Sequence, residues 1–130
     1  MIALPKWVYG HIRNQAAGEA PNEACGYLLG IDSIVKLHHP MTNVDASPEH
    51  FSFDPKEQFA AVKRSRALRL SLIGVYHSHP ASPARMSLED IRLANDTSLY
   101  YLIYSRPDNT IKAFTVTRQK AIHEVPVKLT

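Results

Sequence analysis

Two histidines stand two residues apart at the end of an apolar run, an arrangement that can bind a metal ion. The run Leu70–Val75 is typical of a buried strand, and His77 and His79 follow it. Side chains two apart on a strand project from the same face, so both imidazoles point together and Ser78 points away. Paired neutral imidazoles suit zinc. The sequence therefore predicts a metal site at this strand end.

Asp90 is the candidate third ligand, because the prolines and serine that follow His79 favour a turn back toward the strand. Ser87 and Asp90 also have the spacing of a capping box, in which Ser87 caps a helix and the acidic residue answers it. Each feature alone is more often structural, but the two interpretations are compatible, since such a helix aims Asp90 at the histidines. Three protein ligands leave a fourth position for water, as in catalytic zinc sites.

The spacing of these residues resembles the JAMM motif of the MPN-plus zinc metalloproteases, a family of ubiquitin-isopeptidases and their prokaryotic relatives. The motif stands here as His77-x-His79-Pro80-x6-Ser87-x2-Asp90, with no position missing. The resemblance implies one zinc ion per chain, bound by the two histidines and the aspartate, with water as the fourth ligand. It also implies the fold of that family, which is similar to that of cytidine deaminases.

The same family carries a glutamate far upstream, on a strand that faces the metal, and the resemblance makes Glu23 the candidate for it. Glu23 would act as the general base, which accepts the proton of the attacking water and delivers it to the leaving amine. The Ser87 hydroxyl would donate to the oxyanion. Ser78 and Asn43, which lies within the similar region, are candidates for contacts with the substrate or with the site residues.

The resemblance implies hydrolysis of an amide bond after the flexible C-terminal tail of a ubiquitin-like protein. Little chain separates Asp90 from the next predicted strand, so the insertions by which eukaryotic members grip their substrates have no room. The chain looks like the stand-alone prokaryotic members, and a ThiS- or MoaD-like sulfur-carrier protein is the expected partner. Release of ubiquitin-like proteins from lysines, as by a desampylase, is the alternative.

Two other classes of protein, a non-catalytic scaffold and a deaminase, could also have a zinc site of this kind. A non-catalytic MPN scaffold would keep zinc only for stability, but the inactive members of the family generally lack part of the ligand set. A cytidine-deaminase-like enzyme would need a Cys-x-x-Cys ligand pair. Cys25 is the only cysteine, which excludes that enzyme, and we expect it to be a small core residue.

Composition fits one domain spanning residues 1–130 in the cytoplasm. There is no apolar run long enough for a membrane span, the N-terminus lacks the pattern of a secretory signal, and a single cysteine forms no internal disulfide. The net charge of +3 is concentrated near Lys63–Arg69, a pattern typical of a solvated helix end. No aromatic residues interleave these cations, so we expect no nucleic-acid partner. Monomer and homodimer stay open.

The elements that position the site follow from periodicity and turn signals. We expect a helix over Pro5–Gly18 with Trp7, Val8, Ile12 and Ala16 on one side, a helix capped by Asp54 and ending near Ala67, and a short helix over Ser87–Asn95. The expected strands are Ala24–Ile31, Ile34–His39, Leu70–Tyr76, Leu99–Ser105, Ile111–Thr117 and Ala121–Lys128, the last interrupted by Pro126 at a sheet edge. This order predicts an α/β sandwich of the α+β kind, with a mixed, largely antiparallel sheet, two main helices and a short ligand-bearing helix.

Overall fold

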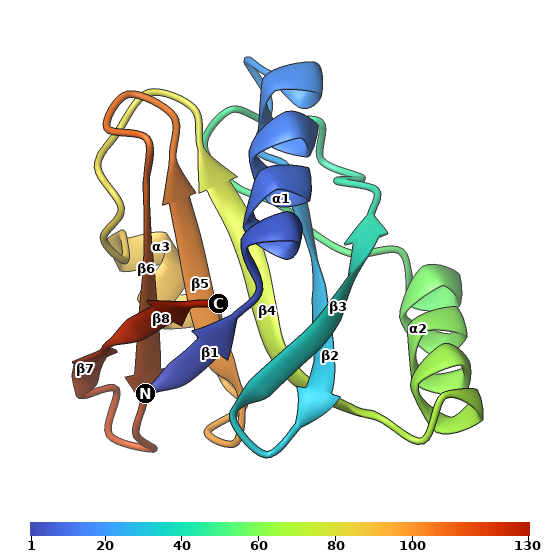
Figure 1. The fold of residues 1–130 in the computed structure, drawn as a ribbon. Helices are drawn as coiled ribbons and strands as arrows, with labels where there is room; N and C mark the ends of the chain where they lie inside the picture. The colour runs from blue at the N-terminus through green and yellow to red at the C-terminus, as the bar shows by residue number, and fades with distance from the viewer.

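A computed structural model describes all 130 residues and shows a strongly curved sheet with helices on both faces (Figure 1). The helices are α1 (Lys6–Glu19), α2 (Pro55–Ala67) and α3 (Leu88–Leu93). The strands are β1 (Ile2–Leu4), β2 (Cys25–Ile31), β3 (Ile34–Met41), β4 (Ser71–His79), β5 (Tyr100–Ser105), β6 (Thr110–Val116), β7 (Ile122–Val125) and β8 (Val127–Leu129).

The order of the strands in the sheet is β7-β6-β5-β4-β2-β3-β1-β8. Four of the seven neighbouring pairs are antiparallel, which confirms the predicted mixed, largely antiparallel sheet. The pairing of β2 with β4 matters most for the site. Because these strands run antiparallel with Cys25 opposite His77, the start of β2 lies beside the end of β4, and residues just before β2 approach the two histidines.

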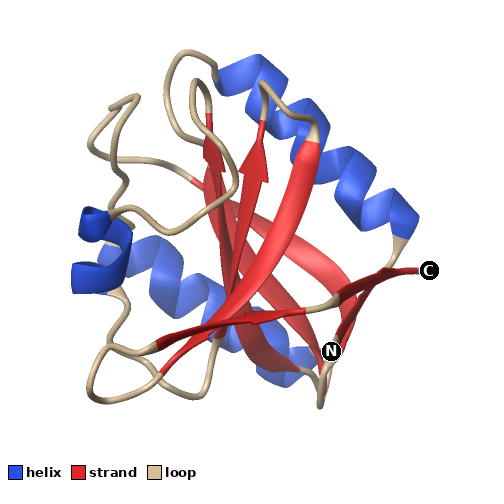
Figure 2. Ribbon diagram, turned by 90° about the vertical axis from the view of Figure 1, so that its left-hand side faces the viewer, coloured by secondary structure: helices blue, strands red, loops and turns tan.

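The helices divide between the two faces of the sheet, as the predicted sandwich requires (Figure 2). On one face α1 buries Val8, Ile12 and Ala16 against the main core cluster. On the other face α2 buries Ala61 in a second cluster with Cys25, which confirms Cys25 as a core residue. No helix is both long and apolar enough to cross a membrane.

Three local predictions need correction. Trp7 is 52% exposed and sets its ring edge-on to His11 rather than joining the core, because consecutive helical residues lie about 100° apart and Trp7 falls beside the buried stripe. Strand β3 continues through Pro40, beyond its predicted end at His39. On one side of β3, Pro40 pairs with Gly26 of β2; on the other side, β1 pairs with β3 only at Ile34. The missing N–H of Pro40 therefore faces a side without a neighbouring strand. Helix α3 ends at Leu93, short of the predicted end.

The C-terminal segment does not form one edge strand, as predicted from its periodicity. It divides at Pro126 into β7 and β8, which take opposite ends of the strand order. The sheet therefore curls until its two edges meet, and the backbone N–H of Ile2 donates to Pro126 O at 3.0 Å. Strand β1, which the sequence pattern did not predict, pairs with β8 in parallel.

Candidate metal centre

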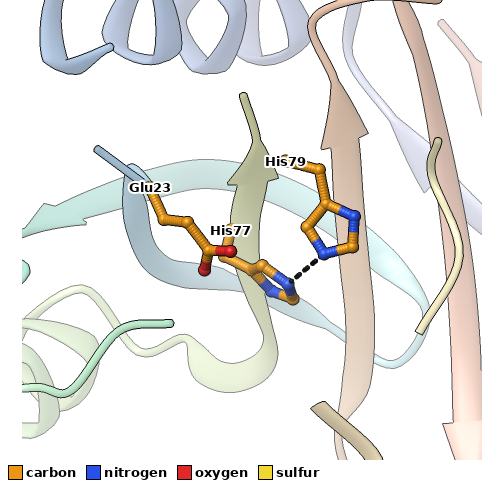
Figure 3. A group of neighbouring side chains, drawn as sticks. All are labelled: Glu23, His77 and His79. Atoms are coloured by element: carbon orange, nitrogen blue, oxygen red, sulfur yellow. Dashed lines mark hydrogen bonds between the residues drawn. The ribbon is translucent and has the colours of Figure 1, made fainter. Parts of the chain in front are cut away.

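The end of β4 presents two imidazoles on one side of the sheet (Figure 3). His77 and His79 are both buried, and their Nε2 atoms lie 3.2 Å apart. The strand extends through His79, so the alternation of the pleat, and not a loop conformation, makes the rings converge.

Asp90 approaches both rings from the first turn of α3. Its Oδ1 lies 3.2 Å from His77 Nε2 and its Oδ2 lies 3.1 Å from His79 Nε2, and the carboxylate is only 6% exposed. Ser87 accepts from the Asp90 N–H, while the Asp90 carboxylate accepts from the Ser87 N–H, both at 3.0 Å. Both halves of the predicted capping box are present. This box fixes the direction in which Asp90 leaves the helix.

The distances among these three side chains fit zinc. With zinc bonds of about 2.0–2.1 Å, the ligand atoms of a tetrahedral site lie roughly 3.3 Å from each other. The two Nε2 atoms of His77 and His79 are 3.2 Å apart, and each lies 3.1–3.2 Å from a different oxygen of the Asp90 carboxylate. Burial raises the pKa of Asp90, but the bonds with His77 and His79 outweigh it and hold that pKa well below its usual range. Asp90 is thus a carboxylate, the form that binds a metal.

Neighbouring groups fix the orientation of both imidazoles. The Nδ1 atom of His79 lies 2.8 Å from Pro83 O. A carbonyl oxygen only accepts, so Nδ1 carries a proton, and loss of the other ring proton leaves the lone pair on Nε2, the nitrogen that faces Asp90 and His77. The ring of Phe51 packs against that of His77, with centroids 4.9 Å apart. No local sequence pattern predicted this contact of Phe51 with His77.

Glu23 lies beside the histidines (Figure 3), but two residues before the start of β2 and not on the strand itself. One ligand atom each from Glu23, His77 and His79 lie within 4.8 Å of one another. Glu23 is 2% exposed, and its buried Oε1 has no hydrogen-bond partner. A buried carboxylate oxygen without a donor is costly unless something binds it. This unsatisfied atom is a second observation that fits a metal ion or its water at the site.

Burial raises the pKa of Glu23 to about 8, more than the positive ring of His79 lowers it. A carboxyl whose pKa rises on folding binds its proton more tightly in the folded state. The stabilisation is complete below the unfolded pKa of 4.5 and is lost as the pH rises through the folded value of about 8. Burial lowers the pKa of His79, but its bonds with Asp90 and Pro83 raise it by more, so His79 contributes with the same sign.

We therefore expect metal-free protein to lose thermal stability between pH 6.5 and about pH 8. Below pH 6.5, His38 opposes this loss of stability. Burial lowers the pKa of His38 from 6.5 to about 4, so the contribution of His38 to stability increases as the pH rises between these two values. The melting temperature of wild type and Glu23→Gln, followed over the window by circular dichroism, checks this. The Gln variant should lose less stability; equal slopes would contradict a raised Glu23 pKa.

Ser78, the residue between the two histidines, points away from them and fixes the segment that carries Glu23. Its Oγ accepts from the Ala24 N–H at 2.8 Å, and its own N–H donates to Ala24 O at 2.9 Å. These bonds extend the pairing of β2 with β4 by one residue beyond Cys25. Since Ser78 is 1% exposed, its position favours a supporting contact over contact with a substrate.

Asn43 holds the other side of the Glu23 backbone. Its Nδ2 donates to Glu23 O and to His50 O, both at 3.1 Å, and its Oδ1 accepts from Asp45 N at 3.1 Å. Asn43 is buried, and the Glu23 N–H donates to Ser47 O in the same loop. One amide side chain therefore joins Glu23 to the loop that carries Phe51, again a supporting contact.

Replacing Asn43 by alanine should lower the free energy of unfolding by about 1–3 kcal/mol, because two carbonyls and the partly buried N–H of Asp45 lose their partner. Urea unfolding of the metal-free protein measures it. Asn43→Asp should lower it by at least as much, because a buried carboxylate oxygen would then face the carbonyl oxygens of Glu23 and His50. Asn14→Ala on the exposed side of α1 is the control and should stay within about 0.5 kcal/mol of wild type. A similar loss in both alanine variants would contradict the role.

An apolar hollow opens beside the histidines. A small cavity of about 40 Å³ adjoins His77 and Asp90, and a larger one of about 360 Å³ continues from it. The two share Phe51, Leu93 and Tyr101. Three segments far apart in the sequence supply these residues, so no local pattern could have identified them. The hollow gives an extended chain a place to lie next to the metal site.

Comparisons with known proteins agree with this geometry. The family model described as prokaryotic homologs of the JAB domain matches residues 5–119. A desampylase from Haloferax volcanii is 35% identical over 109 residues, which cover 82% of this chain and 78% of that protein. The CysO-cysteine peptidase of Mycobacterium tuberculosis is 29% identical over 119 residues, with coverage of 88% and 81%.

A solved structure extends the likeness to the whole fold. The solution structure of a protein from Desulfitobacterium hafniense is 43% identical and superposes with a TM-score of 0.91, covering 100% of this chain and 93% of that one. The family match spans every element that carries a candidate site residue, from the start of β2 to α3.

Proposed function

The chain belongs to the family of prokaryotic homologs of the JAB domain, and from this premise we propose that it is a zinc-dependent peptidase acting on the C-terminal tail of a ubiquitin-like sulfur-carrier protein. Membership and the named relatives make it a hydrolase. The observation that carries the proposal is the close triangle of His77, His79 and Asp90 with the buried, unpartnered carboxylate of Glu23 beside it.

His77, His79 and Asp90 would hold the zinc ion. When bound, zinc supplies a Lewis acid that polarises a carbonyl and lowers the pKa of a water molecule to about 7. The residues of the chain do the rest. His79 is held in the required tautomer by Pro83, and Asp90 is held by the capping box, so the ligands need little rearrangement to bind a metal.

Glu23 is the general base. Its carboxylate accepts a proton from the attacking water as the new carbon–oxygen bond forms, and returns that proton to the amine nitrogen as the carbon–nitrogen bond breaks. The raised pKa of Glu23, about 8, suits both steps near neutral pH. A nearby cation favours the ionised form and lowers this value, toward the range in which a base works best.

Ser87 supplies a hydrogen bond to the oxyanion. Its Oγ accepts from the Asp90 N–H at 3.0 Å, which leaves the hydroxyl proton free to donate. The N-cap position holds Oγ at the start of α3, on the same turn as Asp90. The oxygen of the attacked carbonyl becomes negative, and a donor fixed beforehand lowers the barrier more than one that must first be oriented.

The apolar hollow along Phe51, Leu93 and Tyr101 accommodates the tail. A tail that lies extended here brings a single amide bond to the histidines. The likeness to the Haloferax desampylase supports a second candidate, in which the amine is a lysine of a conjugated protein. The chemistry at Glu23 and Ser87 is the same in both cases, and only the leaving group differs.

The test is the intact mass of substrates after incubation with zinc-loaded protein. Sulfur-carrier proteins with C-terminal extensions form one set, and lysine-linked conjugates of the same carriers form the other. Loss of the extension supports the peptidase, while release of the lysine-bearing protein supports the isopeptidase. Protein that binds zinc and cleaves neither set would contradict both and favour a non-catalytic scaffold.

A further inference from the structure

The short helix that carries Asp90 contributes nothing to the core. None of the six residues of α3 is buried, and Leu88 and Leu93 are 87% and 49% exposed. Hydrophobic packing of α3 is therefore limited to the half-buried Ile91 and to the buried Ala94 just after the helix, and a helix of this length is unstable by itself. The capping box fixes only its N-terminal end. Some other contact must hold the C-terminal end.

Lys120 makes that contact from the hairpin between β6 and β7. Its ammonium group lies 3.1 Å from Ile91 O, 3.3 Å from Arg92 O and 2.8 Å from Ala94 O. It also lies 2.8 Å from Asn95 Oδ1. These carbonyls are at the end of α3, where the last turn leaves acceptors without donors inside the helix. A cation there also complements the negative end of the helix.

The hairpin holds Lys120 rigidly. Lys120 takes a left-handed conformation with φ of 65°, and its N–H donates to Thr117 O at 2.9 Å. The neighbouring Ala121 and Thr117 pair through both backbone and side chain, since the Ala121 N–H donates to Thr117 Oγ1. The long side chain of Lys120 therefore projects from a fixed base.

The same sheet carries both Lys120 and the histidines. Strand β6, which leads into the hairpin, pairs with β5, and β5 pairs with β4 in a register that sets Ile103 opposite His77. Across these neighbouring strands, β4 carries the two imidazoles, and the hairpin after β6 carries the ammonium group that binds α3. The distance of α3 from the imidazoles is thereby set by the sheet.

We propose that Lys120 is a positioning residue for the metal centre, which acts through α3 to hold Asp90 against His77 and His79. The proposal rests on the metal site described above. Lys120 does not touch that site, and Ile91, whose carbonyl it binds, directly follows Asp90 in the chain. Without Lys120, α3 keeps the capping box, the contacts of Asp90 and the buried Ala94, but its C-terminal carbonyls lose their cation. We therefore expect the end of the helix to move more and Asp90 to be held less firmly against the histidines.

The test compares Lys120→Met, which removes the charge and the donors, with Lys120→Arg, which keeps both. Lys112→Met is the matched control, because Lys112 is an exposed lysine of β6 that lies 4.0 Å from Glu124 on the surface. Competition with a chromophoric chelator gives the zinc dissociation constant. Loss of a supporting contact weakens metal binding by about 10–100-fold, so we expect this for Lys120→Met, near wild-type binding for Lys112→Met and substantial recovery for Lys120→Arg.

Amide hydrogen exchange of the metal-free protein is the second measurement, and it needs neither zinc nor a substrate. Exchange in residues 88–93 should accelerate by about tenfold in Lys120→Met, while exchange in β4 and β5 stays unchanged. Should that variant fail to fold, Lys120→Gln, with a donor on a shorter stem, takes its place. Unchanged exchange in α3 overturns this inference alone, and so does an equal loss of zinc affinity in Lys112→Met. Wild-type protein that binds no zinc instead overturns the proposed function.

Discussion

Glu23→Gln should reduce kcat by about 10²–10⁴-fold while the protein keeps its zinc. The substitution preserves the shape of a side chain that is 2% exposed, so the packing around it changes little. An amide does not accept the proton of the attacking water, and the reaction loses its base. Zinc content is expected to stay the same because His77, His79 and Asp90 form the close triangle without Glu23.

The measurement pairs turnover of a carrier protein or its conjugate with zinc content by mass spectrometry under non-denaturing conditions. Glu124→Gln, the same substitution on the exposed surface of β7, is the control and should cleave like wild type. Normal cleavage by Glu23→Gln would refute its role as the base. Loss of zinc from Glu23→Gln would instead make Glu23 a ligand.

Removing a proposed zinc ligand should give a different result from Glu23→Gln: the protein should lose its zinc, and its activity should be lost as a consequence. We expect His77→Ala and Asp90→Ala to bind zinc at least about 100-fold more weakly, since residues that only support ligands already account for about 10–100-fold. Asp90 has a further effect, because its carboxylate lies within 3.2 Å of both rings and accepts from the Ser87 N–H. Its removal disturbs the whole site.

Measuring the melting temperature of each variant with and without zinc tests this prediction directly. A ligand present at 100 times its dissociation constant stabilises the folded state by about 2.7 kcal/mol, and the two variants should lose this rise. His123→Ala, an exposed histidine of β7, is the control and should keep it. A zinc-induced rise of wild-type size in Asp90→Ala would show that Asp90 is not a ligand.

The local part of the site could be predicted from the sequence because each signal has a short range. The alternation of a strand predicts that His77 and His79 share a face, and the structure confirms it. The spacing of Ser87 and Asp90 predicts a capped helix, which is confirmed as well. Both rules depend only on neighbours a few residues away, so tertiary contacts had little opportunity to override them.

Asn43 was a candidate for a supporting contact, but the partners of Asn43 and Lys120 could not be predicted, because they are backbone carbonyls that any sequence possesses. Asn43 in a loop and Lys120 in a hairpin turn are ordinary residues for such places. Their significance comes from carbonyls that the fold brings to them, at Glu23 and at Ile91. Strand β1 escaped prediction for a related reason: three residues are too few to show a period, and its pairing with β8 is what defines it.

The two parts of the catalytic apparatus differ in how much of the fold each requires. The three proposed ligands lie within fourteen residues of one another, so a partly folded chain already carries every group that holds the metal. The base is more than fifty residues upstream, and it reaches the histidines only when β2 pairs with β4. A chain in which β2 has not paired with β4 would therefore carry the proposed ligands without the base, and until the hairpin after β6 forms it would also lack the contact of Lys120 with α3. On this proposal, hydrolysis requires a sheet that is complete from β2 to β7.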